Sequence, residues 1–308
     1  MAIDKAVDSA ALETGLTKVA NAIRTKGGTS GKLAFPDGMA EAVAAIEAGG
    51  GAKEPYVEYT VEPYGSNFRS IAAELHGFTK IPYGLFNANS MLVTVTGIEP
   101  VTHIYDYAFS GCNSLVMDSL PDKLEYIGNY AFSSCKKLGL TKLPDNLKKI
   151  AARGFYGAKV LITALPDGIE SLGDAAFEDC NDIVLTYLPS SLKSIGSSAF
   201  ASCDKITITT IPDGVETIDS STFYGCNGIT RMTIPASVKS INFNAFKYCR
   251  NLKKITFKGT PSDYIRNDVF TGCTNLLTIN VPWAEGAVAN APWSATNATI
   301  NYNYVEAG

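Results

Sequence analysis

The sequence of 308 residues has few of the side chains from which enzymes usually build catalytic or metal sites. It contains only two histidines, His76 and His103, and two tryptophans. Nucleophile-elbow, zinc-protease, phosphate-loop and dinucleotide-binding motifs do not occur in a fitting context. The seven cysteines form no CxxC pair, the spacing typical of zinc and thiol redox sites. We therefore expect a protein that is not an enzyme and needs neither a metal nor a cofactor.

Other absences exclude whole classes of partner. A net charge of -4 and a pI near 5.3 lack the positive field that a nucleic-acid partner requires. No stretch approaches the ~18 consecutive apolar residues of a membrane span, so we expect no membrane insertion. The first residues, MAIDKAVDSAALETG, carry acids where a signal peptide has a basic start and an apolar run. We expect synthesis in a bacterial cytoplasm, without export by the general secretory pathway.

A repeat of about 23 residues dominates the chain between residues 75 and 282. A phenylalanine marks each unit, and an isoleucine or leucine always stands five residues before it. The phenylalanines are Phe86, Phe109, Phe132, Phe155, Phe177, Phe200, Phe223, Phe246 and Phe270. A turn and an apolar strand follow each one, and most strands close on a proline, as at Pro144. One unit cannot bury its apolar face alone, so about nine stacked units should form a solenoid.

The units match a known repeat family. PDKLEYIGNYAFSSCKKL and PASVKSINFNAFKYCRNL resemble the BspA-like leucine-rich repeats of bacterial surface proteins. The resemblance covers about two thirds of the chain and implies a right-handed superhelix with a parallel sheet along one side. The expected fold class is therefore an α/β solenoid, with a tight helical turn at each Ala-Phe pair.

The cysteines share one position in the repeat, three residues after the phenylalanine. They are Cys112, Cys135, Cys180, Cys203, Cys226, Cys249 and Cys273. Zinc or disulfides are one interpretation, but an odd number of cysteines cannot pair completely. The favoured interpretation is a ladder of buried free thiols, since a free cysteine behaves as a small hydrophobe in a core.

A second position alternates in charge, seven residues before the phenylalanine. Its residues are Glu125, Lys148, Glu170, Lys193, Glu216, Lys239 and Asp263. Stacked units would give each charge opposite neighbours on both sides. We interpret this as an exposed seam that sets register and solubility, because a site for a charged ligand would concentrate one sign.

The strands change pattern along the chain, which changes the residues they expose. The middle strands have a Leu-x-Leu-x-x-Leu pattern and should expose mainly Thr and Ser, with Lys142, Tyr187 and Thr210 among the outward residues. The last three strands shift register and should expose Arg231, Lys253 and Lys254. Threonine-rich faces are normal for solvated sheets, and they also suit polar ligands such as glycans. These six residues form the predicted ligand surface.

The two ends differ from the repeats. Residues 1–50 should form two short amphipathic helices closed by three glycines, a module for attachment or oligomerisation. Residues 51–74 should be a linker and a capping strand, and residues 283–308 a C-terminal cap containing Trp283 and Trp293. The segment LTKVANAIRTKGGTSGKLAFPDGMAEAVAAI resembles an N-terminal module of tail-associated and other structural proteins of bacteriophages and prophages of gut Firmicutes.

The N-terminal resemblance implies a virion structural protein, tail-associated and involved in receptor binding. Residues 1–50 would attach it to other virion proteins or form a homo-oligomer, and the solenoid would bind a host-surface glycan or protein. The expected location is then the virion, assembled in the bacterial cytoplasm. The alternative is a bacterial cell-surface adhesin of the BspA kind.

Overall fold

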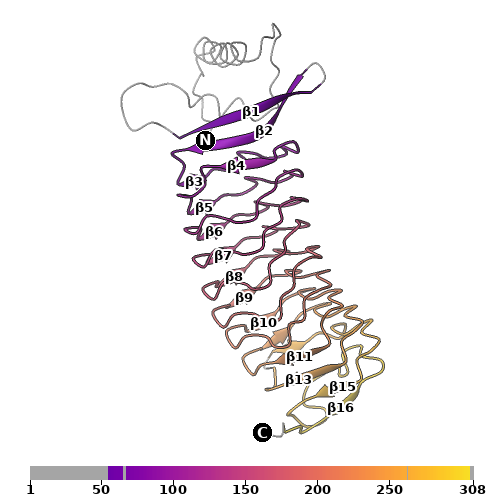
Figure 1. Ribbon diagram of the computed structural model, residues 1–308. Coiled ribbons are helices and arrows are strands. Elements are labelled where there is room, and N and C mark those ends of the chain that lie inside the picture. Colours follow the sequence, from indigo (N-terminus) through magenta and orange to yellow (C-terminus); the bar gives the residue numbers. More distant parts are fainter. Residues whose placement is uncertain (1–54, 65–66, 262, 306–308) are drawn as a thin grey trace, which may run out of the picture.

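A computed structural model describes residues 55–64, 67–261 and 263–305. In this part the chain forms a stack of similar coils that runs from one end of the molecule to the other (Figure 1). The helical module predicted for residues 1–50 lies outside the described residues. Among the described residues, no helix has the length and hydropathy of a membrane span.

Sixteen strands occur in the described part, and only the first two are long. These are β1 (Tyr56–Tyr64) and β2 (Asn67–His76). The others have two to four residues: β3 (Lys80–Ile81), β4 (Thr94–Thr96), β5 (His103–Ile104), β6 (Tyr126–Ile127), β7 (Lys149–Ile150), β8 (Ser171–Leu172), β9 (Ser194–Ile195), β10 (Thr217–Ile218), β11 (Arg231–Ile234), β12 (Ser240–Ile241), β13 (Lys254–Phe257), β14 (Tyr264–Ile265), β15 (Thr278–Asn280) and β16 (Thr299–Asn301).

The repeat isoleucines define the first parallel sheet surface. Successive units pair in register, so that Ile104 lies beside Ile127 and Ile127 beside Ile150. The resulting sheets have the orders β3-β5-β6-β7-β8-β9 and β10-β12-β14. Each isoleucine is buried, while the residue before it is at least partly exposed in every unit except at Ser240, as the alternation of a strand leads us to expect. The predicted parallel-sheet solenoid is confirmed.

The repeat phenylalanines form a continuous buried column along the axis. Neighbouring rings lie 5.1 to 5.8 Å apart between centroids, and their planes are inclined by 4° to 26°. Every one of these rings is at most 2% exposed. Since each ring contacts only the units above and below, stability comes from nearest-neighbour contacts along the column.

The helical turns expected at the Ala-Phe pairs are absent, so the α/β assignment was wrong for the described residues. Around Phe132 the backbone makes tight turns, with Ser133 N donating to Tyr130 O and Cys135 N to Phe132 O. Tyr130 (φ 54°) and Ser134 (φ 61°) are left-handed on either side of the ring. A left-handed residue two positions away on each side prevents a right-handed helix from continuing.

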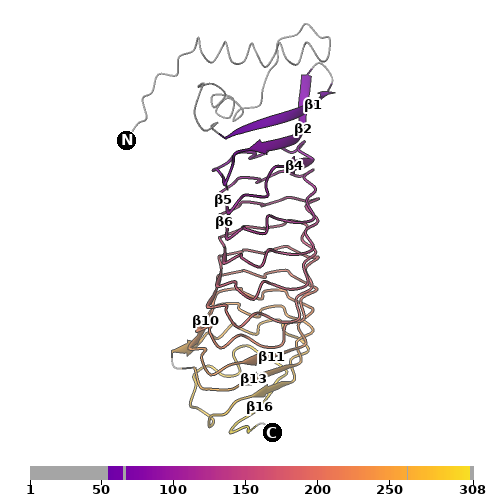
Figure 2. The ribbon, with the colours of Figure 1, turned by 60° about the vertical axis from the view of Figure 1, so that its left-hand side comes forward.

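Both ends of the column are covered. β1 and β2 pair antiparallel and β2 pairs in parallel with β4, so this hairpin lies across the first coil (Figure 2). At the other end, β16 pairs with β15, and Trp283 and Trp293 are buried against Phe257. These elements cover the apolar ends of the column within the described chain.

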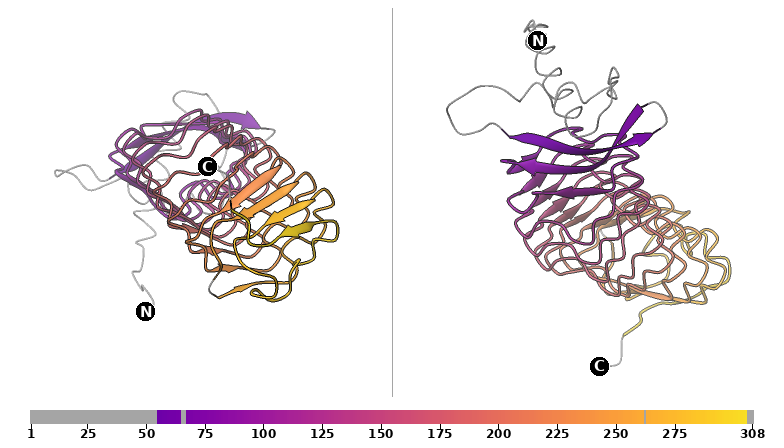
Figure 3. Two further views of the ribbon diagram at one scale, coloured as in Figure 1. Left: turned by 90° about the horizontal axis from the view of Figure 1, so that it is seen from below. Right: turned by 45° about the horizontal axis from the view of Figure 1, so that its top comes forward.

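The solenoid changes character near residue 210. No β-bridge joins β9 to β10 among the described residues, and a second parallel sheet, β11-β13-β15-β16, begins after β10, at Arg231. Figure 3 shows the C-terminal coils, orange to yellow, set off sideways from the earlier stack. The change coincides with the register shift of the strand pattern at Arg231. Hydrogen bonds of the phenylalanine turns continue across it, as from Phe200 N to Thr222 O.

Candidate binding face

The six predicted ligand-surface residues are all exposed. Lys142, Tyr187 and Thr210 occupy equivalent positions, each directly before a buried residue that precedes a turn proline. The repeat therefore brings these three side chains onto one line along the solenoid. Thr210 continues the line through a parallel bridge to Thr233 of β11.

Arg231 and Lys254 extend the same face into the C-terminal sheet, and Lys253 precedes β13. Arg231 stands two residues before Thr233 on β11, so both side chains point to the same side of that strand. Arg231 pairs in register with Lys254 of β13, and Lys253 is exposed beside it. We call the surface made by Lys142, Tyr187, Thr210, Arg231, Lys253 and Lys254 the candidate binding face.

The positively charged side chains of this face differ in their contacts with neighbouring residues. Lys142 Nζ lies 3.1 Å from Asp145 Oδ1, a pair that is exposed to solvent and therefore weak. Lys254 Nζ lies 5.9 Å from the centroid of the Tyr304 ring. Arg231 makes no ion pair within 4 Å in the described chain. The C-terminal half of the face thus presents cations available to an external acceptor.

A line of exposed apolar side chains beside this face was not predicted from the sequence. Val93, Val116, Leu161 and Val184 each follow a buried leucine, isoleucine or valine by one residue, and they are 37% to 52% exposed. The signal was present, because the four residues recur at the period of the repeat. With Tyr187, 49% exposed, they give the first half of the face an apolar border.

A second group of rings, partly buried at Tyr107 and Tyr130 and exposed at Tyr83, was also not predicted. Tyr107 and Tyr130 stack with centroids 4.8 Å apart and planes inclined by 7°, and Tyr83 continues the column. Arg153 lies over the Tyr130 ring, 5.3 Å from its centroid, and donates a hydrogen bond to the Tyr130 hydroxyl. These rings occupy the turns after the isoleucine strands, another side of the coil. Their faces are covered by one another, which indicates a structural role.

The predicted charge seam forms in part. Ion pairs join Glu170 to Lys193 at 3.5 Å and Glu216 to Lys239 at 2.7 Å. Lys148 makes no ion pair within 4 Å in the described chain, although its backbone N donates to the Glu125 carbonyl. The seam therefore consists of separate pairs between units and carries no ligand site.

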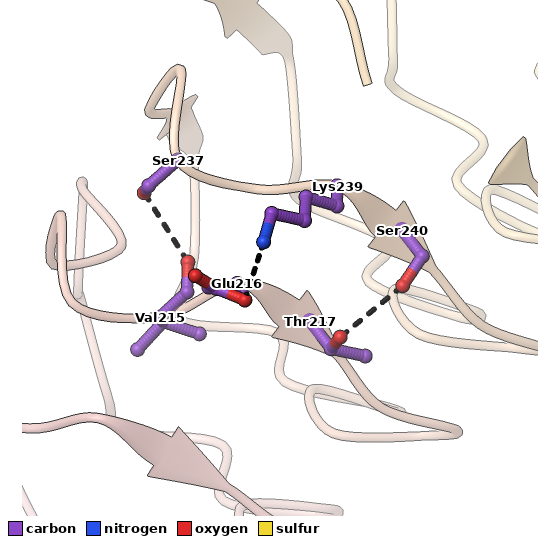
Figure 4. Close-up of polar contacts among 6 residues, drawn as sticks. All are labelled: Val215, Glu216, Thr217, Ser237, Lys239 and Ser240. Atoms are coloured by element: carbon purple, nitrogen blue, oxygen red, sulfur yellow. Dashed lines mark hydrogen bonds and ion pairs between the residues drawn. The ribbon is translucent and has the colours of Figure 1, made fainter. Parts of the chain in front are cut away.

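Neutral hydrogen bonds accompany the Glu216–Lys239 ion pair between the same two units (Figure 4). Ser237 Oγ donates to the Val215 carbonyl at 3.2 Å, and the hydroxyls of Thr217 and Ser240 lie 3.2 Å apart. Together with the Glu216–Lys239 pair, these contacts link the backbone and side chains of successive coils. They hold the outer strands in register.

The seven cysteines lie as buried free thiols along the core. All seven are free and buried, and each Sγ donates to the carbonyl of the phenylalanine one unit earlier at 3.0 to 3.1 Å. Burial raises the pKa of Cys112, Cys180 and Cys273 to about 12. A thiol with so high a pKa is a poor nucleophile and a poor metal ligand, so the cysteines are structural.

Several solved structures are similar to part of this chain. A leucine-rich cell surface protein of Faecalibacterium prausnitzii is 22% identical over 65% of this chain and 69% of its own, with a TM-score of 0.40. Leucine-rich repeat proteins of Bacteroides ovatus (17% identity, 80% of this chain and 98% of that one) and Treponema pallidum (24%, 71% and 87%) both give TM-scores of 0.41. No curated protein matches the chain.

The family of the repeat follows from the sequence pattern itself. The model of the BspA type leucine-rich repeat region matches residues 64–184 and 182–289, in six copies. These ranges contain the phenylalanine column, the cysteine ladder and the candidate binding face. The chain therefore belongs to the BspA-type leucine-rich repeat proteins.

Proposed function

We propose that this protein is a non-enzymatic recognition protein of the bacterial cell surface, which binds a glycan or a protein of another surface through the candidate binding face. One observation carries the proposal. Lys142, Tyr187 and Thr210 recur at one position of a rigid ladder and are joined by the cations of β11 and β13. A solenoid of stacked repeats presents an extended surface for binding, and the side chains on that surface decide which ligand it binds.

The chemistry of the face suits an extended, polar ligand. Exposed threonine hydroxyls can donate and accept hydrogen bonds, and Tyr187 offers an aromatic ring with a polar end. Arg231 and Lys254 provide neighbouring cations for carboxylate or sulfate groups. Tyrosine and arginine are the residues that most often dominate the affinity of an interface.

The proposal is tested by a paired substitution on the face. Lys142→Glu with Tyr187→Ala should reduce binding of the purified protein to intact cells by at least tenfold and leave the melting temperature unchanged, because both side chains are exposed. Binding is measured by flow cytometry and then on an array of glycans. The matched control, Lys123→Glu with Tyr83→Ala, alters an exposed lysine and an exposed tyrosine outside the face and should bind normally. An equal loss of cell binding in both double variants would contradict the proposal.

A second candidate is a tail-associated virion protein, favoured by the resemblance of residues 1–50 to a phage attachment module. In that case residues 1–50 would join other virion proteins or a second copy. Deleting residues 1–50 should then convert an oligomer to a monomer in light scattering, and antibodies should label tails in electron micrographs of particles. Unlabelled particles and an unchanged oligomeric state would exclude this role and leave the cell-surface one.

A further inference from the structure

The hairpin that covers the first coil brings three metal-ligating side chains together. Glu58 on β1 lies directly opposite Glu74 on β2, and His76 follows two residues later on the same side of β2. His76 Nε2 lies 3.8 Å from Glu58 Oε2 and 3.6 Å from Glu74 Oε1. One nitrogen and one oxygen from each carboxylate all lie within 4.8 Å of one another.

The two carboxylates are unfavourably placed unless a positive charge, from a bound cation or a protonated His76, lies between them. Two carboxylates directly opposite on neighbouring strands repel each other and destabilise the pairing. His76 Nε2 is itself buried and has no hydrogen-bond partner, although the imidazole as a whole is 31% exposed. A buried polar atom without a partner carries a free-energy cost that a bound ligand removes.

The three groups are held by rigid elements. The His76 ring stacks on Tyr56, with centroids 4.5 Å apart and planes inclined by 13°, which fixes the direction of Nε2. On the opposite side of the hairpin, Val57, Ala73 and Leu75 are buried in the core. The ligating atoms therefore project from strands that pack on the first coil. Side chains on such rigid elements hold the geometry of a site more precisely than side chains on loops.

We propose that Glu58, Glu74 and His76 bind a Zn²⁺ ion. In a tetrahedral site with bonds of about 2.0–2.1 Å, ligand atoms lie roughly 3.3 Å apart, so the observed separations need only small side-chain shifts. One imidazole nitrogen with two carboxylate oxygens is a zinc donor set, whereas Ca²⁺ and Mg²⁺ take oxygen ligands alone. The fourth coordination position is open to water or to another donor. Bound zinc links β1 to β2 and strengthens the cap of the solenoid.

The experiment is a titration of the full, reduced chain with Zn²⁺, followed by calorimetry. The wild type should bind one equivalent and melt at a higher temperature with zinc than without it. H76Q and E74Q should each weaken binding at least tenfold; E74Q changes an exposed side chain and leaves the hairpin packing intact. The matched control is H103Q, which removes the other of the two histidines of the chain and should bind zinc as the wild type does.

Substitution of Co²⁺ distinguishes this site from the cysteines. Cobalt bound by nitrogen and oxygen shows no thiolate charge-transfer band, whereas cobalt bound by cysteine does. The proposal is overturned if zinc does not bind, if H76Q and E74Q bind as tightly as the wild type, if H103Q loses zinc as they do, or if the thiolate band appears. None of these results depends on the candidate binding face.

Discussion

The seven buried thiols predict that this protein loses stability steeply at alkaline pH. An unfolded cysteine ionises with a pKa near its ordinary value of 9.0, whereas burial raises the pKa of Cys112, Cys180 and Cys273 to about 12 in the folded protein. Burial also raises the pKa of the other four thiols well above the ordinary value. Because the folded state keeps these protons longer, it binds more protons than the unfolded state between pH 9 and 12.

The sign and size of the effect follow from this difference. The stability that the folded state has with all its thiols protonated is present below pH 9 and is lost as the pH rises toward 12. Ionisation of each of the three thiols with a pKa of about 12 costs the folded state less than about 0.1 kcal/mol at pH 8 but about 1.4 kcal/mol at pH 10. The three thiols with a pKa of about 12 together cost about 4 kcal/mol at pH 10, and the other four add to this loss, so the total is a large part of the stability of a typical domain.

Urea denaturation followed by far-UV circular dichroism, from pH 7 to pH 10 under reducing conditions, measures this loss. The free energy of unfolding should be nearly constant to pH 8 and then fall steeply. Cys203→Ala should lower stability at pH 7 yet make the alkaline slope shallower, since one titrating group is gone. Alanine already occupies the equivalent position at Ala158. Thiol reagents should react with none of the seven cysteines at pH 8 in the folded protein and with all seven after denaturation.

A flat pH profile up to pH 10, or an alkaline slope that Cys203→Ala leaves unchanged, would refute the reasoning. So would rapid thiol labelling of the folded protein at pH 8, because it would show that the ladder is accessible.

Two further predictions concern the repeat itself. Phe177→Ala removes a fully buried ring from the column and should cost about 3–5 kcal/mol in urea denaturation, whereas Tyr187→Ala on the surface should change stability by less than about 0.5 kcal/mol. Ser202 has φ 60° where other units have Gly157 and Gly225, so Ser202→Gly should raise stability by roughly 0.5–1 kcal/mol. The control Ser197→Gly, at a position without a positive φ, should lower it by a similar amount; a loss in both variants would contradict the argument.

The interior of this protein could be predicted residue by residue from the sequence. In a solenoid each unit packs on a copy of itself, so an apolar residue that recurs with the period must face the axis. For this reason the repeat alone places Phe132, Ile127 and Cys135 in the core, where all three are buried. The exposed positions of Lys142, Tyr187 and Thr210 follow from the same rule.

Features that depend on backbone geometry could not be predicted in this way. The left-handed residues Tyr130 and Ser134 turn the expected helical segment into tight turns, and neither residue type signals a positive φ. The alternating charges predict a continuous seam, but flexible exposed lysines pair only at Lys193 and Lys239 among the described residues of that seam.

The sequence by itself determined the repeat, its core and the outward positions of the candidate binding face, because periodicity alone decides which side chains face the axis. Only the tertiary structure decided which non-repeating residues meet. Glu58 is separated from Glu74 and His76 by a hairpin turn, and their approach depends on the antiparallel register of β1 and β2. The sideways displacement of the C-terminal coils is likewise a feature of the tertiary structure, and it lies near the break in pairing between β9 and β10.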